Sequence, residues 1–499
     1  MHKLFEKKIS ATGLGVFRAI YFLNFFFEVK YIYNNRQLFF DTVPFIKPFE
    51  LDFTYPLIIW LSILIFIVIG YHTRFLVIIN YLFSLIFIST LSSFEYHMDY
   101  VYCGMNFLAM FLPLSKEFSI DKLISQDNSS DHKVSVLYYY FPLFLCVGLL
   151  YFDSVLCKLT SKMWLNGLGV WLPASTPQIT IFNDQWLLNQ KYLMLFLGYL
   201  TLVFEFIFVF VFFIKKLRIP ILIIGVGLHL GILLEFPIPY FALGMMSFYV
   251  LMVPVSLWDK LFLKISSWEV STKLVFYIKK IFKSNVSYGV VPQKRKFMIL
   301  KVLFISMLFF QVNTSFNAAF MQPLNKEVYK VLSMLNLDSR FNMVNKNIAA
   351  FSKVTLGITN HTVFLDGHFD GYNHVVGITY VKDGKEIWLP YVNENGMANK
   401  NATGSVWAFL GFRTNGTLVK PKKFEYGIAR FTAFWARKNG ISLNDATFKI
   451  KVKKIDSPNW KWEKDYLSKQ LDKPWQDAGE LIWLKEKAQI NLIKAIEEI

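Results

Sequence analysis

The sequence predicts an α-helical multi-pass membrane protein with about nine transmembrane helices and a soluble α+β domain at its C-terminus. Hydrophobic residues make up 54% of the 499 residues and charged residues only 18%, whereas about 25% charge is usual for globular chains. The apolar residues lie in long runs, and the last third of the chain is more polar. This composition excludes a soluble, disordered or nucleic-acid-binding protein as the leading interpretation.

Nine apolar stretches are long enough, or nearly so, to cross a bilayer as a helix, which takes about 20 residues. They lie at residues 13–30, 55–71, 75–94, 98–115, 136–157, 190–214, 219–236, 239–257 and 297–314. The second is short, and only residues 235–239 separate the seventh from the eighth. The number of transmembrane helices can therefore differ by one from nine. No small-residue cleavage site follows the basic N-terminus, so we expect an uncleaved first helix rather than a signal peptide.

Lysine and arginine residues set the expected orientation, because short cytoplasmic loops carry an excess of them. The N-terminus, the turn at 215–218 and the connection at 258–296 are all basic. With nine spans these regions share one side, which we assign as cytoplasmic. The loop at 158–189 and the C-terminal domain then lie on the periplasmic or luminal side.

Three parts are expected along the chain. Residues 1–260 form the transmembrane domain with helices one to eight, residues 261–318 an interfacial basic segment and the ninth helix, and residues 319–499 the extracytoplasmic α+β domain. Lysines alternate with Trp and Leu in 258–296, which predicts one or two amphipathic helices lying on the membrane surface.

Short-range patterns predict the elements of the C-terminal domain. Asp383-Gly384 between two apolar runs predicts a β-hairpin, and Pro390 places the second strand, 386–392, at a sheet edge. Further strands are expected at 403–413 and 446–454, and helices at 427–438 and from 463 to the end. The three cysteines lie outside this polar third, and His-Glu-x-x-His and Cys-x-x-Cys motifs are absent. No metal site is therefore expected.

Ionisable residues inside or at the ends of apolar spans are the candidates for function, because they are costly there. Arg18, in the first turns of the first span, either snorkels to the headgroups or forms a buried pair. His97 opens the fourth span, where Asp99 could set its tautomer. Lys158 and Lys162, at the end of the fifth span, are four residues apart and are expected to share a helix face. A lysine beside a second cation can become a general base, although a snorkelling anchor is the commoner role.

Two more titratable residues lie within spans. His229 is surrounded by three glycines in 225–231, which would let a helix or a flat ligand approach closely. Glu205 lies in the middle of the sixth span. Both are expected to face the bundle interior, where either a structural contact or a functional role is open. The pattern is compatible with an intramembrane enzyme or with a transporter that uses Glu205 and His229, although no inverted repeat is visible.

The order of four motifs resembles that of the HTTM superfamily, to which the vitamin K-dependent gamma-carboxylases belong. The motifs are Leu14-Gly-Val-Phe-Arg18; His97-x-x-Tyr100-x-Tyr102 with Asn106 and Ser119-x-Asp121; Lys158 with Trp164 and Gly167; and His229 with Phe241-x-x-Gly244-x-x-Ser247. They cover roughly residues 12–260. The sequence departs from the animal carboxylase at Tyr96 and Cys157, where that enzyme has asparagine and lysine.

The resemblance implies a carboxylase or quinol epoxidase of the lyase class. It places Lys158 as the base that deprotonates a reduced vitamin K or menaquinol-type naphthoquinone, with oxygen and carbon dioxide as co-substrates. It implies that His97 orients or protonates the quinol oxygens, and that His229, Tyr100 and Trp164 line the cofactor pocket. Membrane lipid and a protein substrate on the outer side, carboxylated at glutamate, are the implied partners.

A non-enzymatic function is the main alternative. The helices would then anchor an outer domain that binds a partner through aromatic residues such as Trp388, Trp407 and Trp435. Under that interpretation Lys158 and His97 would tolerate substitution.

Overall fold

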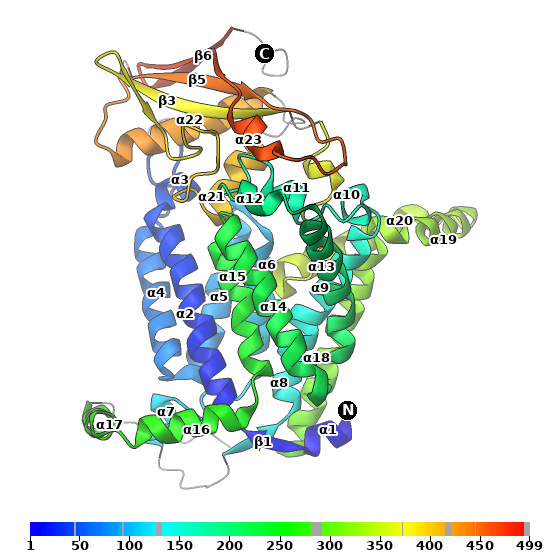
Figure 1. Ribbon diagram of the computed structural model, residues 1–499. Helices are drawn as coiled ribbons and strands as arrows, with labels where there is room; N and C mark the ends of the chain where they lie inside the picture. The colour runs from blue at the N-terminus through cyan, green and yellow to red at the C-terminus, as the bar shows by residue number, and fades with distance from the viewer. Residues whose placement is uncertain are drawn as a thin grey trace.

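Long helices form an upright bundle that carries a β-sheet at one end, while the N-terminus lies at the other end (Figure 1). We call these the sheet end and the N-terminal end. The computed structural model describes residues 1–43, 46–91, 94–125, 132–281, 292–371, 373–414, 421–444 and 446–493. The placement of the two ends agrees with the predicted topology, but which side of a membrane each end faces stays a prediction.

The helices of the bundle are α2 (Thr12–Asn34), α4 (Thr54–Ile69), α5 (Thr73–Leu91), α6 (His97–Ala109), α13 (Lys191–Val211), α14 (Lys215–Glu235), α15 (Pro239–Tyr249) and α18 (Gln293–Phe316). A further continuous helix combines α8 (Leu137–Pro142), the π-helical segment η2 (Leu143–Gly148) and α9 (Leu149–Lys158). Pro142 has no N–H for the usual hydrogen bond, and the wider π-helical turns follow it directly.

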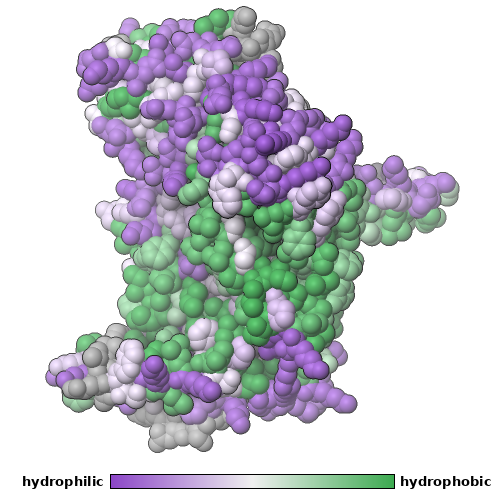
Figure 2. Space-filling view, viewed as in Figure 1, coloured by the Kyte–Doolittle hydropathy of each residue, from purple (hydrophilic) through white to green (hydrophobic). Residues whose placement is uncertain are grey.

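Six helices of the described residues are long and apolar enough to cross a membrane, and α15 with α16 adds a seventh if that pair, bent by 95°, is one span. The predicted count of nine is therefore not confirmed. Helix α4 has 16 residues, and α6 has 13 rather than the 18 predicted for 98–115. Side chains of the bundle form a hydrophobic belt between hydrophilic ends (Figure 2).

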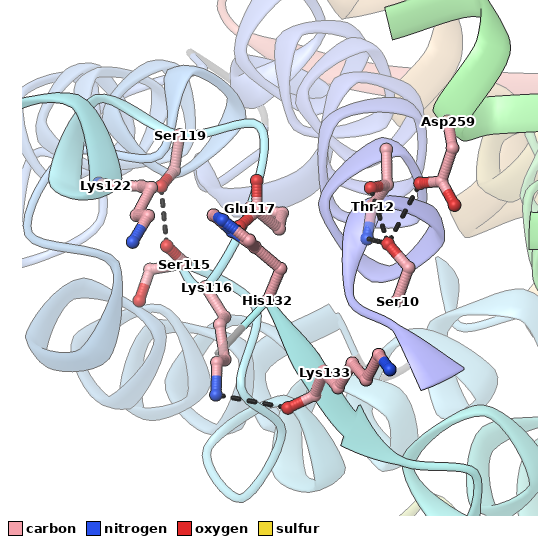
Figure 3. Close-up of polar contacts among 10 residues, drawn as sticks. All are labelled: Ser10, Thr12, Ser115, Lys116, Glu117, Ser119, Lys122, His132, Lys133 and Asp259. Atoms are coloured by element: carbon pink, nitrogen blue, oxygen red, sulfur yellow. Dashed lines mark hydrogen bonds and ion pairs between the residues drawn. The ribbon is translucent and has the colours of Figure 1, made fainter. Parts of the chain in front are cut away.

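Short elements close the N-terminal end. They are α1 (His2–Glu6), α7 (Ile120–Ile124), and the antiparallel pair β1 (Lys8–Ser10) and β2 (Lys133–Ser135). Ser10 donates a hydrogen bond to Asp259, which lies on the basic segment that follows α15, and Ser119 accepts one from the backbone N–H of Lys122 (Figure 3). The basic segment forms two helices, α16 (Val255–Ser266) and α17 (Glu269–Ile281), which extend across this end (Figure 1).

The C-terminal sheet has five antiparallel strands in the order β4-β3-β5-β6-β7. They are β3 (His374–Lys382), β4 (Lys385–Trp388), β5 (Thr447–Lys454), β6 (Trp475–Leu484) and β7 (Lys487–Leu492). Helix α22 (Pro421–Lys438) packs on one face of the sheet, where Trp483 donates a hydrogen bond to Thr432. The predicted hairpin, the edge position of the strand before Pro390, and β5 and α22 are confirmed.

Two predictions for this region are wrong. Residues 403–413 form α21 (Gly404–Ala408) and a π-helical segment instead of a strand, because this segment is packed on the bundle, where Phe409 stacks on Phe94. Within the described residues 463–493, only α23 (Tyr466–Leu471) is helical, and β6 and β7 follow it; residues 494–499 lie outside the described residues. Leu481 and Trp483 are buried in the sheet, whereas Ile482 and Leu484 are more exposed, and this alternation outweighs the helix-favouring lysines and glutamates nearby.

Small helices at the sheet end connect the bundle to the C-terminal domain. They are α3 (Arg36–Phe40), α10 (Lys162–Leu165), α11 (Trp171–Ala174) and α12 (Gln185–Leu188). Arg430, buried on α22, donates hydrogen bonds to the backbone oxygens of Leu38, Phe39 and Asp41, at 2.7, 3.1 and 3.0 Å. One arginine thus satisfies carbonyl groups that the end of α3 leaves without partners.

Replacing Arg430 by alanine should lower the free energy of unfolding by about 2–4 kcal/mol, because buried carbonyl oxygens lose their donor. Thermal unfolding of the purified protein in detergent measures the change. Lys423→Ala, an exposed position on the same helix, is the control and should change stability by less than about 0.5 kcal/mol. Equal unfolding temperatures for the two variants would contradict this account.

Candidate functional site

The side chain of Lys158 is buried at the sheet end of the bundle, at the last residue of α9. Its Nζ donates a hydrogen bond to Oε1 of Glu205 on α13 at 2.5 Å. The same Nζ lies 4.4 Å from the ring centre of Trp164, a cation–π contact. Both charged side chains are less than a tenth exposed, so each compensates a charge that would be very costly alone.

This arrangement corrects the prediction that Lys158 and Lys162 share a helix face. Helix α9 ends at Lys158, and Lys162 begins α10 with its side chain exposed. The carboxylate of Asp366 accepts hydrogen bonds from the Ser161 hydroxyl and from the backbone N–H groups of Lys162 and Met163, at 2.6, 2.7 and 3.0 Å. This capping starts a new helix at Lys162. The group that faces Lys158 is the carboxylate of Glu205, not a second cation.

His229 belongs to a hydrogen-bonded group next to this pair. Its Nε2 lies 2.7 Å from the hydroxyl of Tyr151, which lies 2.6 Å from the hydroxyl of Tyr249. Tyr151 and Lys158 are seven residues apart on α9, so they share one face of that helix. Nδ1 of His229 and Oε2 of Glu205 are buried without a partner. We call the following six residues the Lys158 cluster: Lys158, Glu205, Trp164, His229, Tyr151 and Tyr249.

The glycines around His229 only partly fulfil the expected role. A Cβ at Gly225 would lie 2.7 Å from the ring of Tyr249, so this glycine permits close packing against the cluster. Gly227 and Gly231 have nothing within 4 Å on their Cβ side. The close approach of a helix is therefore confirmed at one glycine of the three.

His97 lies at the first residue of α6 and faces His361 rather than Lys158. The two imidazole rings are 5.7 Å apart between centroids. Nδ1 of His97 and Nε2 of His361 are buried without a hydrogen-bond partner. Nδ1 of His361 lies 3.6 Å from Oδ2 of Asp153, which is an ion-pair contact when the imidazole is protonated. Asp99 does not orient His97, because its Oδ2 accepts the backbone N–H of Tyr96 at 2.8 Å; that expectation is wrong.

Residues 358–366, which we call the strap, join the Lys158 cluster to the pair of His97 and His361. The backbone N–H of His361 donates to Oδ2 of Asp153 at 3.0 Å, and Asp153 also accepts from the Ser315 hydroxyl at 2.6 Å. Farther along the strap, the carbonyl oxygen of Phe364 accepts the indole N–H of Trp164 at 2.8 Å. The strap thus connects His97 with the Lys158 cluster through one continuous backbone.

Tyr100 is placed away from the Lys158 cluster. Its hydroxyl donates to Glu95, and Lys353 lies 4.8 Å above its ring. The structure therefore brings together Lys158, Trp164 and His229 and puts His97 beside His361. Tyr100 lines a small cavity together with His361 and does not contact the Lys158 cluster.

Two buried residues were missed from the sequence. Glu28 on α2 accepts a hydrogen bond from the Tyr96 hydroxyl at 2.7 Å, and its other oxygen has no partner. Glu28 could have been identified from the sequence, because it is a carboxylate within the apolar stretch 13–30. His361 had no such signal, because it lies outside the spans and meets His97 only through the fold. Among the described residues, no group of three or more His, Cys, Asp or Glu could hold a metal ion.

Several motif residues have structural roles at the N-terminal end. Arg18 is buried and donates to the carbonyl oxygens of Leu114, at 2.9 Å, Val68 and Phe118, so it does not snorkel to the headgroups. Asp121 accepts the backbone N–H groups of His72 and Thr73 at 2.7 and 2.9 Å and so caps α5. These residues order the loops and take no part in the Lys158 cluster.

Comparison with known proteins gives one match. The family model described as the HTTM domain matches residues 10–258. No curated protein and no solved structure matches the chain. The matched range contains Lys158, Glu205, His229 and His97, and it ends before α18, the strap and the sheet.

Removing either charge of the buried pair should be more costly than removing both. Glu205→Leu is expected to lower the free energy of unfolding by about 3–5 kcal/mol, because it leaves a buried lysine without its partner. Adding Lys158→Met to that variant should recover most of the loss, and thermal unfolding in detergent measures both. Purely additive effects of the two substitutions would contradict the pairing.

Proposed function

The chain belongs to the HTTM family, whose domain is that of vitamin K-dependent gamma-carboxylase-like proteins, and we propose that it is an enzyme that oxidises a reduced naphthoquinone to its epoxide with Lys158 as the base. The buried contact between Lys158 and Glu205 is the observation that carries this proposal.

The pair offers a chemical reason why a buried lysine could work as a base. A lysine removes a proton only as the neutral amine, and burial in an apolar bundle disfavours an isolated charge. With the carboxyl group of Glu205 at hydrogen-bonding distance, one proton can be held either on the amine or on the carboxylate without any net charge being created. The amine form of Lys158 is then free to accept a proton from a hydroxyl group.

The residues present fit a naphthoquinol. Its ring is flat and apolar, and the Lys158 cluster is surrounded by aromatic side chains, with the Phe241 ring 5.7 Å from His229 and the Phe204 ring 5.5 Å from Tyr151. Its oxygens need hydrogen-bond partners, and Oε2 of Glu205 and Nδ1 of His229 have none at present. A bound quinol would supply an acidic hydroxyl and two electrons for oxygen. Lys158 would accept the proton, and the aromatic residues would exclude water.

Carboxylation of a protein glutamate would be the second half of the reaction. The Lys158 cluster lies at the sheet end of the bundle, beside α10–α12 and the strap, and a protein substrate would reach it from the side that carries the sheet. We propose that His97 and His361 hold oxygen atoms of the quinol or of carbon dioxide through Nδ1 of His97 and Nε2 of His361, which have no hydrogen-bond partner.

Partner binding by the C-terminal domain is a second candidate function. A recess of about 340 Å³ is lined by Trp388, Asn393, Glu394, Asn395 and Asn399, among others, near the edge strand β4. Of the other aromatic residues considered, Trp407 is buried and donates to the carbonyl oxygen of Gln178, and Trp435 packs on Tyr380. Trp388 is thus the aromatic residue that favours this function.

Lys158→Arg should lower the rate of quinone epoxide formation by at least about 100-fold, because a general base contributes roughly 10²–10⁴ and an arginine stays protonated. The arginine keeps a cation opposite Glu205, so the protein should still fold. Mass spectrometry after incubation of purified protein with a reduced naphthoquinone, bicarbonate and oxygen measures the epoxide.

Lys162→Ala is the matched control for this assay. Lys162 lies four residues after Lys158, and its side chain is exposed. Epoxide formation by this variant should therefore match that of the unsubstituted protein. Epoxide from Lys158→Arg at the control rate would refute Lys158 as the base. No epoxide from folded, unsubstituted protein with several quinols would favour partner binding instead.

A further inference from the structure

Helices α19 (Gln322–Met334) and α20 (Asp338–Leu356) follow the last long helix and project sideways from the bundle (Figure 1). We call residues 322–356 the arm. The sequence assigns the arm to the soluble C-terminal domain. In the structure it instead lies at the level where α18 ends, beyond the outline of the sheet (Figure 1).

The two faces of α19 differ in character. Leu324, Val331 and Leu335 are seven and four residues apart, so they lie on one side of the helix, and their exposed fractions are 52%, 57% and 62%. The opposite side carries Lys326, Lys330 and Ser333. No side chain of α19 is buried, so none of the residues that the structure describes covers the apolar face.

Helix α20 also has an apolar side and a basic side. Val344 and Phe351 are seven residues apart, and both are half exposed or more. Lys346 and Lys353 lie on the opposite side. In Figure 2 the arm is hydrophilic above and hydrophobic beneath, and its hydrophobic side turns toward the level of the belt.

The C-terminal end of α20 is firmly attached to the bundle. The carbonyl oxygen of Thr355 accepts the hydroxyl of Tyr81 at 2.7 Å. Gly357 follows with φ +66°, and a Cβ there would lie 1.9 Å from the carbonyl oxygen of Tyr100. Only glycine allows this approach. The orientation of the arm is therefore set by the bundle.

We propose that the arm is a membrane-surface element whose apolar face lies in the bilayer at the sheet end. A lipid bilayer is the occupant that fits, because the apolar face is continuous with the exposed side chains of Ile305, Phe309 and Val312 on α18, and the Phe310 ring lies 5.9 Å from that of Phe351. The arm has five basic and two acidic residues, which suits a surface that contains anionic lipid.

This placement links the bilayer to the candidate site. Helix α20 runs directly into the strap, and the strap holds His361 beside His97. The proposal itself concerns only where the membrane surface lies and holds whether or not the chain oxidises a quinol.

Nitroxide labels test the depth of each face. The full-length protein is placed in vesicles of phosphatidylcholine and phosphatidylglycerol, and one cysteine is introduced at a time: Val331→Cys and Leu335→Cys on the apolar face, and Lys330→Cys and Ser333→Cys as matched controls. The three native cysteines are buried, so labelling is directed to the exposed positions. Collision with oxygen, which concentrates in lipid, and with a water-soluble nickel chelate is then measured for each label.

Labels at Val331 and Leu335 should collide mainly with oxygen and lose contact with the nickel chelate, whereas the control labels should show the reverse. Equal access of the nickel chelate to all four positions would overturn the proposal, because the arm would then lie in water. Dipolar broadening at Val331 that disappears on dilution with unlabelled protein would also overturn it, because a second copy would then cover the apolar face.

Discussion

The buried pair of Lys158 and Glu205 is the constraint on which the arrangement of the sheet end depends. A lysine charge in an apolar bundle needs a partner of opposite sign at hydrogen-bonding distance. That requirement brings α9 against α13, at a contact of 2.5 Å. The ring of Trp164 can lie over the same Nζ only because the chain leaves α9 immediately after Lys158 and turns back.

Residues of the strap, about 200 positions later in the sequence, hold the turn after Lys158. Asp366 supplies the cap that starts α10, and Phe364 supplies the acceptor for the indole of Trp164. In the same way, Arg430 donates hydrogen bonds to backbone carbonyl oxygens at the end of α3. The helix ends at this side of the bundle therefore have backbone groups that only the C-terminal region satisfies, so the HTTM domain and the residues beyond 258 form one structure.

Patterns with a local cause could be predicted from the sequence. Apolar runs identified most of the long helices, and Asp383-Gly384 identified the hairpin between β3 and β4, where both residues have positive φ. The segment 403–413 was mistaken for a strand, because packing on Phe94 rather than local propensity decides its conformation. At the candidate site, Lys158 and His229 were found as costly residues in apolar helices, but Asp99 was assigned to the wrong partner.

The sequence by itself determined that this is a helical membrane protein of the HTTM family with a C-terminal sheet, and that Lys158, Glu205 and His229 lie where burial is costly. The helices, the sheet and the costly charges follow from hydropathy and spacing along the chain, which are local properties, and the family follows from the order of its motifs. Only the tertiary structure decided that Lys158 faces Glu205 and not Lys162, and that His97 meets His361. Such contacts depend on which helices pack side by side and where each helix ends, and residues far apart in sequence carry no sign of meeting until the chain is folded.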